Sequence, residues 1–184
     1  MRIAVDLDEV VYAWERTARY LLRNVYPRGH KLSGLNTPFT EWEIGNTIGD
    51  NAYKWLFDEG IDAGLFRHGH VITGAMLGVR ALKAAGHDLV IVTHRPEKGV
   101  RDTLAWINFH FDTEDPYPWS GINILSGGEP KTDVQWDAIV DDSPKNLEDA
   151  EAHGRLGVQF GAAWNGGGAD WPAVVKGFPP DRRN

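Results

Sequence analysis

The amino-acid sequence predicts an α/β protein built on a doubly wound, Rossmann-like parallel sheet, with helices on both faces and a small helical cap inserted after the first strand. Short apolar, β-branched runs recur along the chain and end in polar residues. Segments with helical spacing separate these runs, and alternation of this kind is typical of parallel βαβ units. The interval between the first two runs is far too long for a connecting loop and predicts an inserted subdomain.

Five segments are predicted as strands, at 2–7, 88–93, 121–126, 137–142 and, more weakly, 157–160. The first four are nearly continuous apolar runs, as expected of strands that are covered on both faces. Each of these four ends in a polar residue. Because the carboxyl ends of parallel strands meet at one edge of a sheet, these polar residues are expected to converge there.

Three segments between the strands show helical signals. The first has an apolar stripe at helical spacing, formed by Val100, Leu104, Ile107 and Phe111. The second covers residues 76–86 and ends at a glycine C-cap, Gly86. The third begins at Ser143, an N-cap residue followed by a proline in the first helical position, and stops at Gly154.

The stretch from residue 14 to residue 74 breaks the alternation of strands and helices. It begins with an amphipathic segment at 14–25, continues through a loop rich in Pro, Gly and Asn at 27–38, and then becomes rich in aromatic residues. We therefore expect an α/β core of residues 1–13 and 75–184, with residues 14–74 forming the helical cap subdomain.

Composition narrows the classes of function. The net charge is 19 − 26 = −7, which argues against extended nucleic-acid binding, because such binding depends on Lys and Arg contacts to phosphates. The absence of cysteine excludes disulfides, thiol nucleophiles and Cys-based metal sites. No apolar run approaches the length of a membrane span, and acids follow the N-terminus, so we expect a cytoplasmic protein with no membrane partner. The sequence fixes no oligomeric state and allows a homodimer.

Carboxylates gather at the predicted strand ends. The polar residues expected to share one crevice are Asp6, Asp8, Thr93, Ser126, Asp141 and Asp142. Alternate residues of an extended chain face the same side, so Asp6 and Asp8 can point together. Because several carboxylates without a fixed cation would repel one another, a divalent ion is the simplest resolution, and an all-oxygen ligand set suits Mg²⁺.

The acids at the strand ends allow other interpretations. A lone Asp-x-Asp is common, and Asp141 and Asp142 could cap the helix that follows them. A hydrophobic strand followed by acids is also typical of P-loop NTPases. That class requires G-x-x-x-x-G-K-[ST], and the segment 127–132 lacks the glycine before its lysine. No G-x-G-x-x-G follows the first strand, so a dinucleotide fold has no support.

Four motifs in order resemble those of the haloacid dehalogenase superfamily of phosphotransferases. They are D-x-D-x-[TV] at 6–10, a strand ending in Thr93, Lys131 after the next element, and the paired acids Asp141 and Asp142. The cap position, the first motif, Lys131-Thr132 and the segment 160–165 most resemble the 5′(3′)-deoxyribonucleotidase family. Glu9 departs from the pattern, because many members have glycine there, and it adds an acid beside the site.

The resemblance implies roles for four catalytic residues. Asp6 would attack phosphorus and form an aspartyl-phosphate, and Asp8 would protonate the leaving alkoxide and then activate water. Thr93 would donate its hydroxyl to a phosphoryl oxygen, and Lys131 would neutralise the phosphoryl group and Asp6. Taken alone, Thr93 could satisfy backbone groups at a strand end, and Lys131 could be a solvated surface lysine.

The same resemblance implies a Mg²⁺ site. Its ligands would be the side chain of Asp6, the backbone carbonyl of Asp8 and an acid of the fourth motif. Asp142 is preferred as that acid, with Asp141 as a close second. A bound cation together with Lys131 would let an anionic substrate approach an acidic protein.

Substrate contacts are expected from two regions. His94 and Arg95 follow Thr93 and could reach a substrate oxygen, or they could start the next helix. In the cap, any of Trp42, Trp55, Phe39 and Phe66 could touch a base, although an aromatic residue in a small subdomain more often belongs to its core. His68 and His70 suggest a metal pair by type, but they have no third ligand nearby and are better interpreted as ordinary surface or core histidines.

Together these features predict a Mg²⁺-dependent phosphomonoesterase, a nucleotidase that hydrolyses nucleoside monophosphates with deoxyribonucleotides favoured. Its partner would be this small phosphomonoester substrate, with no extended nucleic acid expected. Alternatives are a phosphatase of the same superfamily for a sugar phosphate or the terminal phosphate of an oligonucleotide, and a non-catalytic binding protein that retains the fold.

Overall fold

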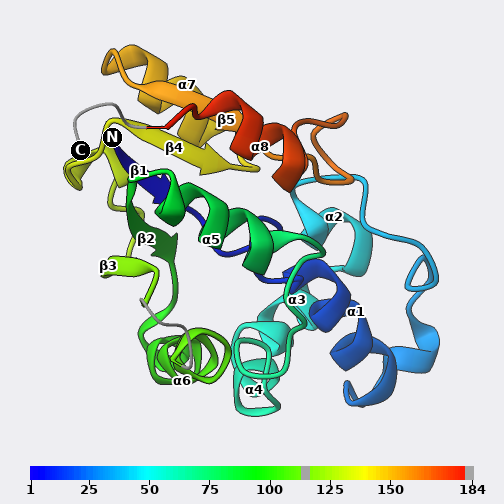
Figure 1. Cartoon of the computed structure of the whole chain (residues 1–184). Coiled ribbons are helices and arrows are strands. Elements are labelled where there is room, and N and C mark those ends of the chain that lie inside the picture. Colours follow the sequence, from blue (N-terminus) through cyan, green and yellow to red (C-terminus); the bar gives the residue numbers. More distant parts are fainter. Residues whose placement is uncertain (113–116, 181–184) are drawn as a thin grey trace.

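Among the described residues, five parallel strands form one sheet in the order β3-β2-β1-β4-β5 (Figure 1). The computed structural model describes residues 1–112 and 117–180. The strands are β1 (Arg2–Val5), β2 (Asp88–His94), β3 (Trp119–Leu125), β4 (Ala138–Asp141) and β5 (Leu156–Gln159). The chain leaves β1 toward β2 and β3 on one side and later returns to β4 and β5 on the other. The predicted fold class is therefore confirmed, and the strand order reverses at β1, where α/β proteins bind their ligands.

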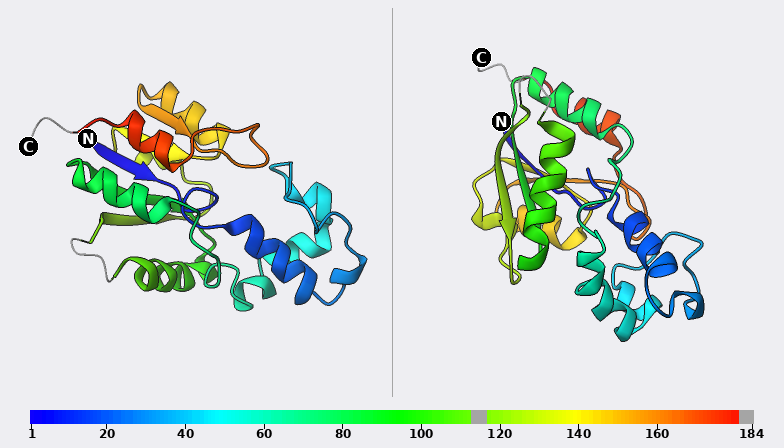
Figure 2. Two further views of the ribbon diagram at one scale, coloured as in Figure 1. Left: turned by 45° about the vertical axis from the view of Figure 1, so that its right-hand side comes forward. Right: turned by 90° about the horizontal axis from the view of Figure 1, so that it is seen from below.

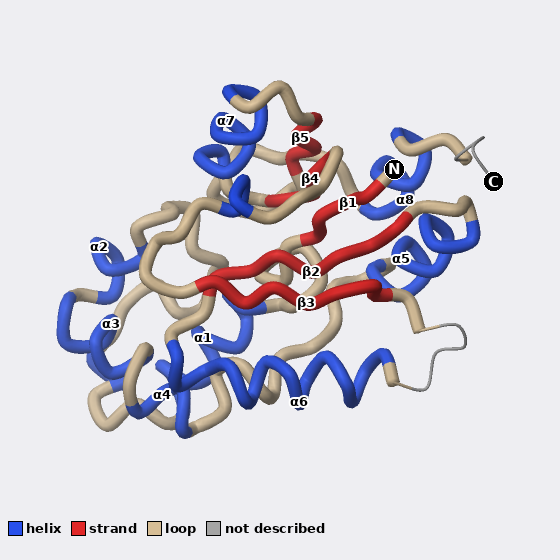
Figure 3. Tube along the Cα trace, turned by 90° about the vertical axis from the view of Figure 1, so that its left-hand side faces the viewer, coloured by secondary structure: helices blue, strands red, loops and turns tan. Residues whose placement is uncertain are grey.

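Residues of each central strand alternate between two apolar layers. Ile3 and Val5 of β1 join the larger buried cluster, whereas Ala4 joins a second cluster on the opposite face. The buried faces of α5 (Ala75–Ala84), α6 (Val100–Phe111) and α8 (Trp171–Gly177) belong to the larger cluster. Ala150 of α7 (Pro144–Ala152) belongs to the second. Helices thus cover both faces of the sheet, as Figures 2 and 3 show.

Two helix details differ from the sequence-based expectation. The stripe expected on α6 is wrong at Leu104, which is 37% exposed, while Thr103 beside it is buried. The reason is that Thr103 accepts a hydrogen bond from a buried arginine, so the inner face of α6 is partly polar. At α7, Ser143 and Pro144 take the expected cap and first-turn positions, but the Ser143 side chain makes no capping hydrogen bond.

The inserted stretch forms four short helices beyond the carboxyl ends of the strands (Figures 1 and 2). They are α1 (Trp14–Asn24), α2 (Ile44–Ile48), α3 (Asp50–Leu56) and α4 (Glu59–Asp62). Their buried residues continue the larger apolar cluster of the core. The boundaries expected for the cap, 14–74, stay a prediction. Within the described residues, no helix has both the length and the apolar character needed to cross a bilayer.

Glu9 lies in the short segment that joins β1 to α1. Its φ is 53°, a left-handed conformation that a residue other than glycine adopts at a cost. Its Oε1 accepts the backbone N–H of Glu15 at 2.7 Å, in the first turn of α1, where no other side chain caps the helix. Burial raises the pKa of Glu9 to about 7. Glu9 therefore fastens the start of α1 to the end of β1.

Candidate active site

The polar residues that follow the strands gather around one cavity of about 530 Å³ between the core and the cap. From the core, the cavity is lined by Asp6, Asp8, Thr93, Lys131 and Asp142. The register of the sheet explains this convergence: β1 pairs with β4 at Val5 and Val140, so the acids that follow each strand end stand side by side. The edge expected from the strand ends is the edge that forms the cavity.

Lys131 links two of the acids. It follows β3 in a short 3₁₀ turn and is only 4% exposed. Its Nζ lies 2.8 Å from Asp6 Oδ1 and 2.8 Å from Asp141 Oδ2. Burial alone would lower the pKa of Lys131, but Asp141 and Asp6 raise it above its usual range. Lys131 is therefore a buried cation in contact with the predicted nucleophile.

Asp141 and Asp142 point in different directions. Asp141 is fully buried and accepts hydrogen bonds from Lys131, the Ser143 backbone N–H at 2.9 Å and the side chain of Asn146. Burial raises its pKa, although Lys131 opposes the shift. Asp142 instead lines the cavity and accepts the indole N–H of Trp164 at 2.9 Å. Asp141 therefore has a structural role, and Asp142 faces the site.

Three carboxylates form a cluster that fits a metal ion. Each of Asp6, Asp141 and Asp142 offers an oxygen, and these three oxygens lie within 4.8 Å of one another. Burial and the neighbouring Asp6 and Asp141 raise the pKa of Asp142 to about 9. A carboxyl so reluctant to ionise beside other acids requires either a proton or a cation. Hard oxygen donors in this arrangement fit a divalent metal ion.

Asp8 is held by an arginine. Arg95 Nη1 lies 2.6 Å from Asp8 Oδ2, and Nη2 lies 2.8 Å from Oδ1, so the two side chains form a bidentate pair. Burial raises the pKa of Asp8 to about 6, although Arg95 opposes this shift. The Asp8 side chain is outside the group of clustered oxygens and keeps 30% of its surface exposed. Its carboxyl therefore lines the cavity apart from the clustered oxygens.

Two further residues at the end of β2 line the cavity. Thr93 is 1% exposed, and its hydroxyl oxygen accepts from Arg95 Nη1 at 3.3 Å, which leaves its O–H free to donate to a ligand. His94 is half-buried, and its Nε2 lies 2.7 Å from the backbone oxygen of Glu129. Ser126, expected at the same edge, is exposed and does not line the cavity; Gly127 and Gly128 do so instead.

Three of the expected substrate contacts are engaged elsewhere in the fold. Arg95 lines the cavity, but its side chain is 1% exposed and its guanidinium is paired with Asp8. Phe39 is 2% exposed and belongs to the core, with its backbone N–H bound by Glu15 at 2.9 Å. Trp55 faces the outer side of the cap, where its indole N–H donates to Glu59 at 2.8 Å. In each case, packing or a charged partner inside the fold takes the group that was expected to face the substrate.

Six aromatic residues line the cavity: Trp14, Trp42, Tyr53, Phe57, Phe66 and Trp164. Trp42 and Phe66, weighed from the sequence as base contacts, are among them, and a contact with substrate stays a prediction. The Trp42 ring packs edge-on against Trp164 of the core at 5.8 Å. The other four were missed. Tyr53 and Phe57 are four residues apart, a spacing that puts both on one face of a helix, so helical periodicity could have found them.

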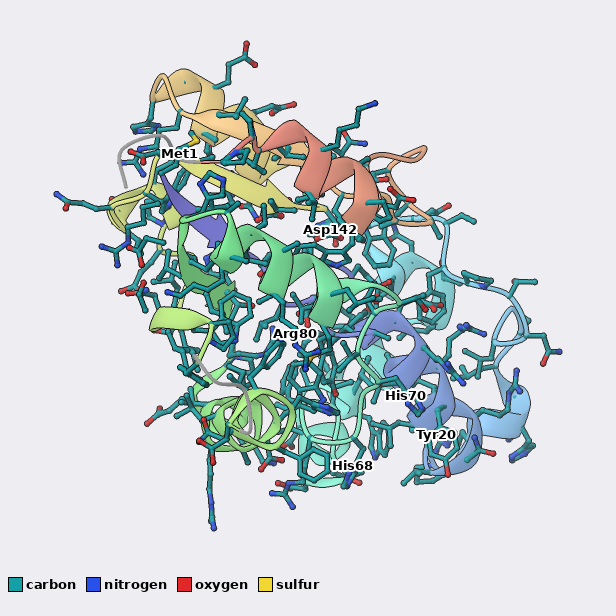
Figure 4. The ribbon with its side chains drawn as sticks, viewed as in Figure 1. Met1, Tyr20, His68, His70, Arg80 and Asp142 are labelled. Carbon is teal, nitrogen blue, oxygen red and sulfur yellow. The ribbon has the colours of Figure 1, made fainter. Side chains whose placement is uncertain are left out.

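His68 and His70 form no site with other ligands among the described residues, and both are exposed and outside the cavity (Figure 4). Figure 4 also shows Asp142 well away from them, at the carboxyl edge of the sheet.

Comparisons with known proteins agree with this geometry. The family model of the 5′ nucleotidase, deoxy (pyrimidine), cytosolic type C protein matches residues 1–168. No curated protein sequence matches the chain. Among solved structures, a haloacid dehalogenase-like family hydrolase from Xanthomonas campestris matches with a TM-score of 0.54 and 17% identity, over 96% of this chain and 95% of that chain.

Two further solved structures share the fold. CbbY from Rhodobacter sphaeroides, in complex with phosphate, matches with a TM-score of 0.54 and 14% identity, over 90% of this chain and 88% of that chain. A HAD-superfamily hydrolase from Ehrlichia chaffeensis matches with a TM-score of 0.52 and 13% identity, over 95% of this chain and 94% of that chain. At such identities the likeness shows a common fold.

Proposed function

Since the chain belongs to the family of the 5′ nucleotidase, deoxy (pyrimidine), cytosolic type C protein, and is thus a phosphomonoester hydrolase, we propose that it is a Mg²⁺-dependent nucleotidase. Its substrates are nucleoside monophosphates, with deoxyribonucleotides favoured. The observation that carries the proposal is the position of Asp6, which lies 2.8 Å from the buried cation of Lys131 and within a cluster of metal-binding oxygens, at a cavity lined by aromatic residues.

The metal site would use the side chains of Asp6 and Asp142 and the backbone carbonyl of Asp8. Asp141 lies in the same cluster, but its oxygens accept from Lys131, Ser143 and Asn146, so it supports the site from behind. A Mg²⁺ ion held here supplies positive charge to the phosphoryl group during transfer.

The first chemical step belongs to Asp6 and Asp8. An Asp6 oxygen attacks phosphorus while the bond from phosphorus to the leaving oxygen breaks. Asp8 gives its proton to that leaving oxygen, so the product leaves as an alcohol. Lys131 neutralises charge on the phosphoryl oxygens, and the Thr93 hydroxyl donates to one of them.

The second step restores the enzyme. Water attacks the phosphorus of the aspartyl-phosphate and releases inorganic phosphate and the Asp6 carboxylate. Asp8, now ionised, takes the proton from that water. The raised pKa of Asp8, about 6, suits a carboxyl that must donate in one step and accept in the next.

The charged residues of the cavity favour a substrate with a single phosphate group. The described Lys and Arg residues that line it are Lys131 and Arg95, and both already pair with carboxylates. Neither is free to hold a second phosphate, which disfavours bisphosphates and oligonucleotide ends. Six aromatic side chains contribute to the rest of the lining, and such rings are suited to a flat, neutral leaving group such as a nucleoside.

Phosphate release from a panel of compounds tests this function. Deoxynucleoside monophosphates, ribonucleoside monophosphates, sugar phosphates and a 3′-phosphorylated oligonucleotide are compared with and without Mg²⁺. Asp6→Asn should abolish turnover, while Asp133→Asn, which changes an exposed acid, serves as the matched control. Equal rates on sugar phosphates and deoxynucleotides would contradict the nucleotide preference, and unchanged turnover in Asp6→Asn would contradict the nucleophile.

A further inference from the structure

Arg95 is almost fully enclosed, yet its guanidinium forms contacts in several directions. Besides its two bonds to Asp8, Nη1 donates to the backbone oxygen of His94 at 2.7 Å and Nε donates to Thr103 Oγ1 at 3.0 Å. The guanidinium carbon lies 4.5 Å from the centre of the Phe66 ring. Because a guanidinium is planar, these contacts fix both its position and the orientation of its plane.

These contacts restrict the conformation of the Asp8 side chain. Asp8 stands in the segment that follows β1, outside the regular sheet, where a lone carboxylate could adopt several rotamers. The bidentate pair with Arg95 selects one of them. Two groups hold Arg95: the hydroxyl of Thr103 on α6 and the backbone oxygen of His94 on β2. Neither belongs to the segment that carries Asp8. The carboxyl is therefore held by the body of the core.

A direct substrate contact fits Arg95 less well. Its side chain is 1% exposed, Nη1 donates to Asp8, to the His94 backbone and, at 3.3 Å, to Thr93, and Nε donates to Thr103. An arginine that recognises phosphate needs its fork free for two parallel bonds. Here that fork is occupied by the Asp8 carboxyl.

We infer that Arg95 is a positioning residue for proton transfer: it holds Asp8 in the orientation from which that carboxyl reaches the leaving oxygen. The inference rests on the proposed function, in which Asp8 is the general acid. A 1 Å error in the placement of a reacting group can cost about 10²-fold in rate. Loss of the pair should therefore lower the rate of proton transfer without removing a substrate contact.

The dependence on the leaving group is the first test. A nucleoside monophosphate releases an alkoxide that needs a proton, whereas p-nitrophenyl phosphate releases a stable phenolate that does not. Asp8 also serves the second step, which both substrates share, so release of the leaving group is followed in a single turnover. Arg95→Met should slow nucleoside release from a deoxynucleoside monophosphate by about 10²-fold, with little change in KM, and should slow p-nitrophenolate release far less. Equal losses on both substrates would overturn the inference.

A double-mutant cycle is the second test. If Arg95 acts only through Asp8, then adding Arg95→Met to Asp8→Asn should cause no further loss of kcat on the nucleotide. A further loss equal to that of Arg95→Met alone would show an independent role and overturn the inference. If Asp8→Asn by itself leaves nucleotide hydrolysis unchanged, the general-acid assignment of the proposed function fails as well, so the two failures are distinguishable.

Two more variants separate positioning from folding. Arg155→Met is the matched control, because Arg155 also lies 4.5 Å from the centre of an aromatic ring, that of Trp136, but bonds a backbone oxygen instead of a catalytic acid. Its rates on both substrates should stay close to those of the native enzyme. Arg95→Lys keeps the charge but loses the fork, so it should fold and still show the selective loss on nucleotides. If Arg95→Lys hydrolyses both substrates at native rates, the bidentate geometry is irrelevant and the inference is overturned.

Discussion

Asp142→Asn should make the metal-free protein more stable while it weakens metal binding. The carboxyl of Asp142 is 1% exposed, and burial together with Asp6 and Asp141 raises its pKa from 3.8 to about 9. At about pH 7.5 the metal-free protein therefore folds only with this carboxyl protonated. Each pH unit above the ordinary pKa costs about 1.4 kcal/mol, so the penalty has a ceiling of about 5 kcal/mol.

Asparagine removes that penalty but introduces an amide that must be hydrogen-bonded. The carboxylates of Asp6 and Asp141 can accept from it, because their oxygens lie within 4.8 Å of those of Asp142. We expect a net gain of about 1–3 kcal/mol in the free energy of unfolding, and hence a rise of about 2–10 °C in Tm for a chain of this size. Thermal unfolding in EDTA measures this gain, and the same scan in Mg²⁺ measures the loss of metal-dependent stabilisation.

Asp133→Asn is the control for this experiment, because its exposed carboxylate should change stability by less than about 0.5 kcal/mol. A lower Tm for Asp142→Asn in EDTA would refute the idea that repulsion among the acids destabilises the metal-free fold. A native-sized rise in Tm on adding Mg²⁺ to this variant would refute Asp142 as a ligand.

Three other outcomes follow from the same geometry. The raised pKa of Asp142 makes the folded protein retain a proton that the unfolded chain releases above about pH 4, so the metal-free protein should lose stability as pH rises toward about 9. The Tm gain from Mg²⁺ should therefore be larger at about pH 8 than at about pH 6, and equal gains would contradict this linkage. Lys131→Met leaves Asp6 and Asp141 buried without their shared cation, so urea unfolding should show a free energy of unfolding lower by about 3–5 kcal/mol. A decrease below about 1 kcal/mol would contradict the importance of these ion pairs. Trp164→Phe removes the hydrogen bond to Asp142 while it keeps an aromatic ring. Mg²⁺ titration followed by thermal shift should show about tenfold weaker binding, with an unchanged Tm in EDTA. Native Mg²⁺ affinity would contradict a supporting role for the indole N–H.

The convergence of the acids could be predicted from sequence because it depends only on where strands end. Asp6 follows β1 directly, Asp141 closes β4, and β1 pairs with β4 at Val5 and Val140. Once both segments are identified as neighbouring parallel strands, the acids must meet. Asp142, preferred from the sequence over Asp141 as the metal ligand, is the acid of the pair that lines the cavity, and that ligation stays a prediction; the position of Lys131 shows what Asp141 contacts instead.

The aromatic lining of the cavity could be predicted only in part, because the cap is built from short helices joined by irregular segments. Phe39 and Trp55 are aromatic like Trp42, and all three lie in the same aromatic-rich stretch. What separates them is the partner that each one finds: Glu15 binds the backbone of Phe39 from 24 residues away, and Glu59 binds the indole of Trp55 from four residues away. The first contact depends on how the chain folds back on itself, which local periodicity does not encode, whereas the second is a local spacing that a reading of the sequence could have used.

The pairing of Arg95 with Asp8 lies between these two cases. The register between β1 and β2 pairs Val5 with Ile91, and counting onward along both strands brings the residues after Asp6 beside those after Thr93. Proximity was therefore predictable, but the direction of the guanidinium was not. It is determined by the chain beyond β2, where the Arg95 backbone N–H bonds Leu125 at 2.9 Å and the side chain turns inward to Thr103. From sequence, an arginine beside a phosphate site is readily interpreted as a phosphate ligand. Here the fold directs it to the acid that would donate the proton. Its loss should therefore change how the rate depends on the leaving group, rather than the affinity for substrate.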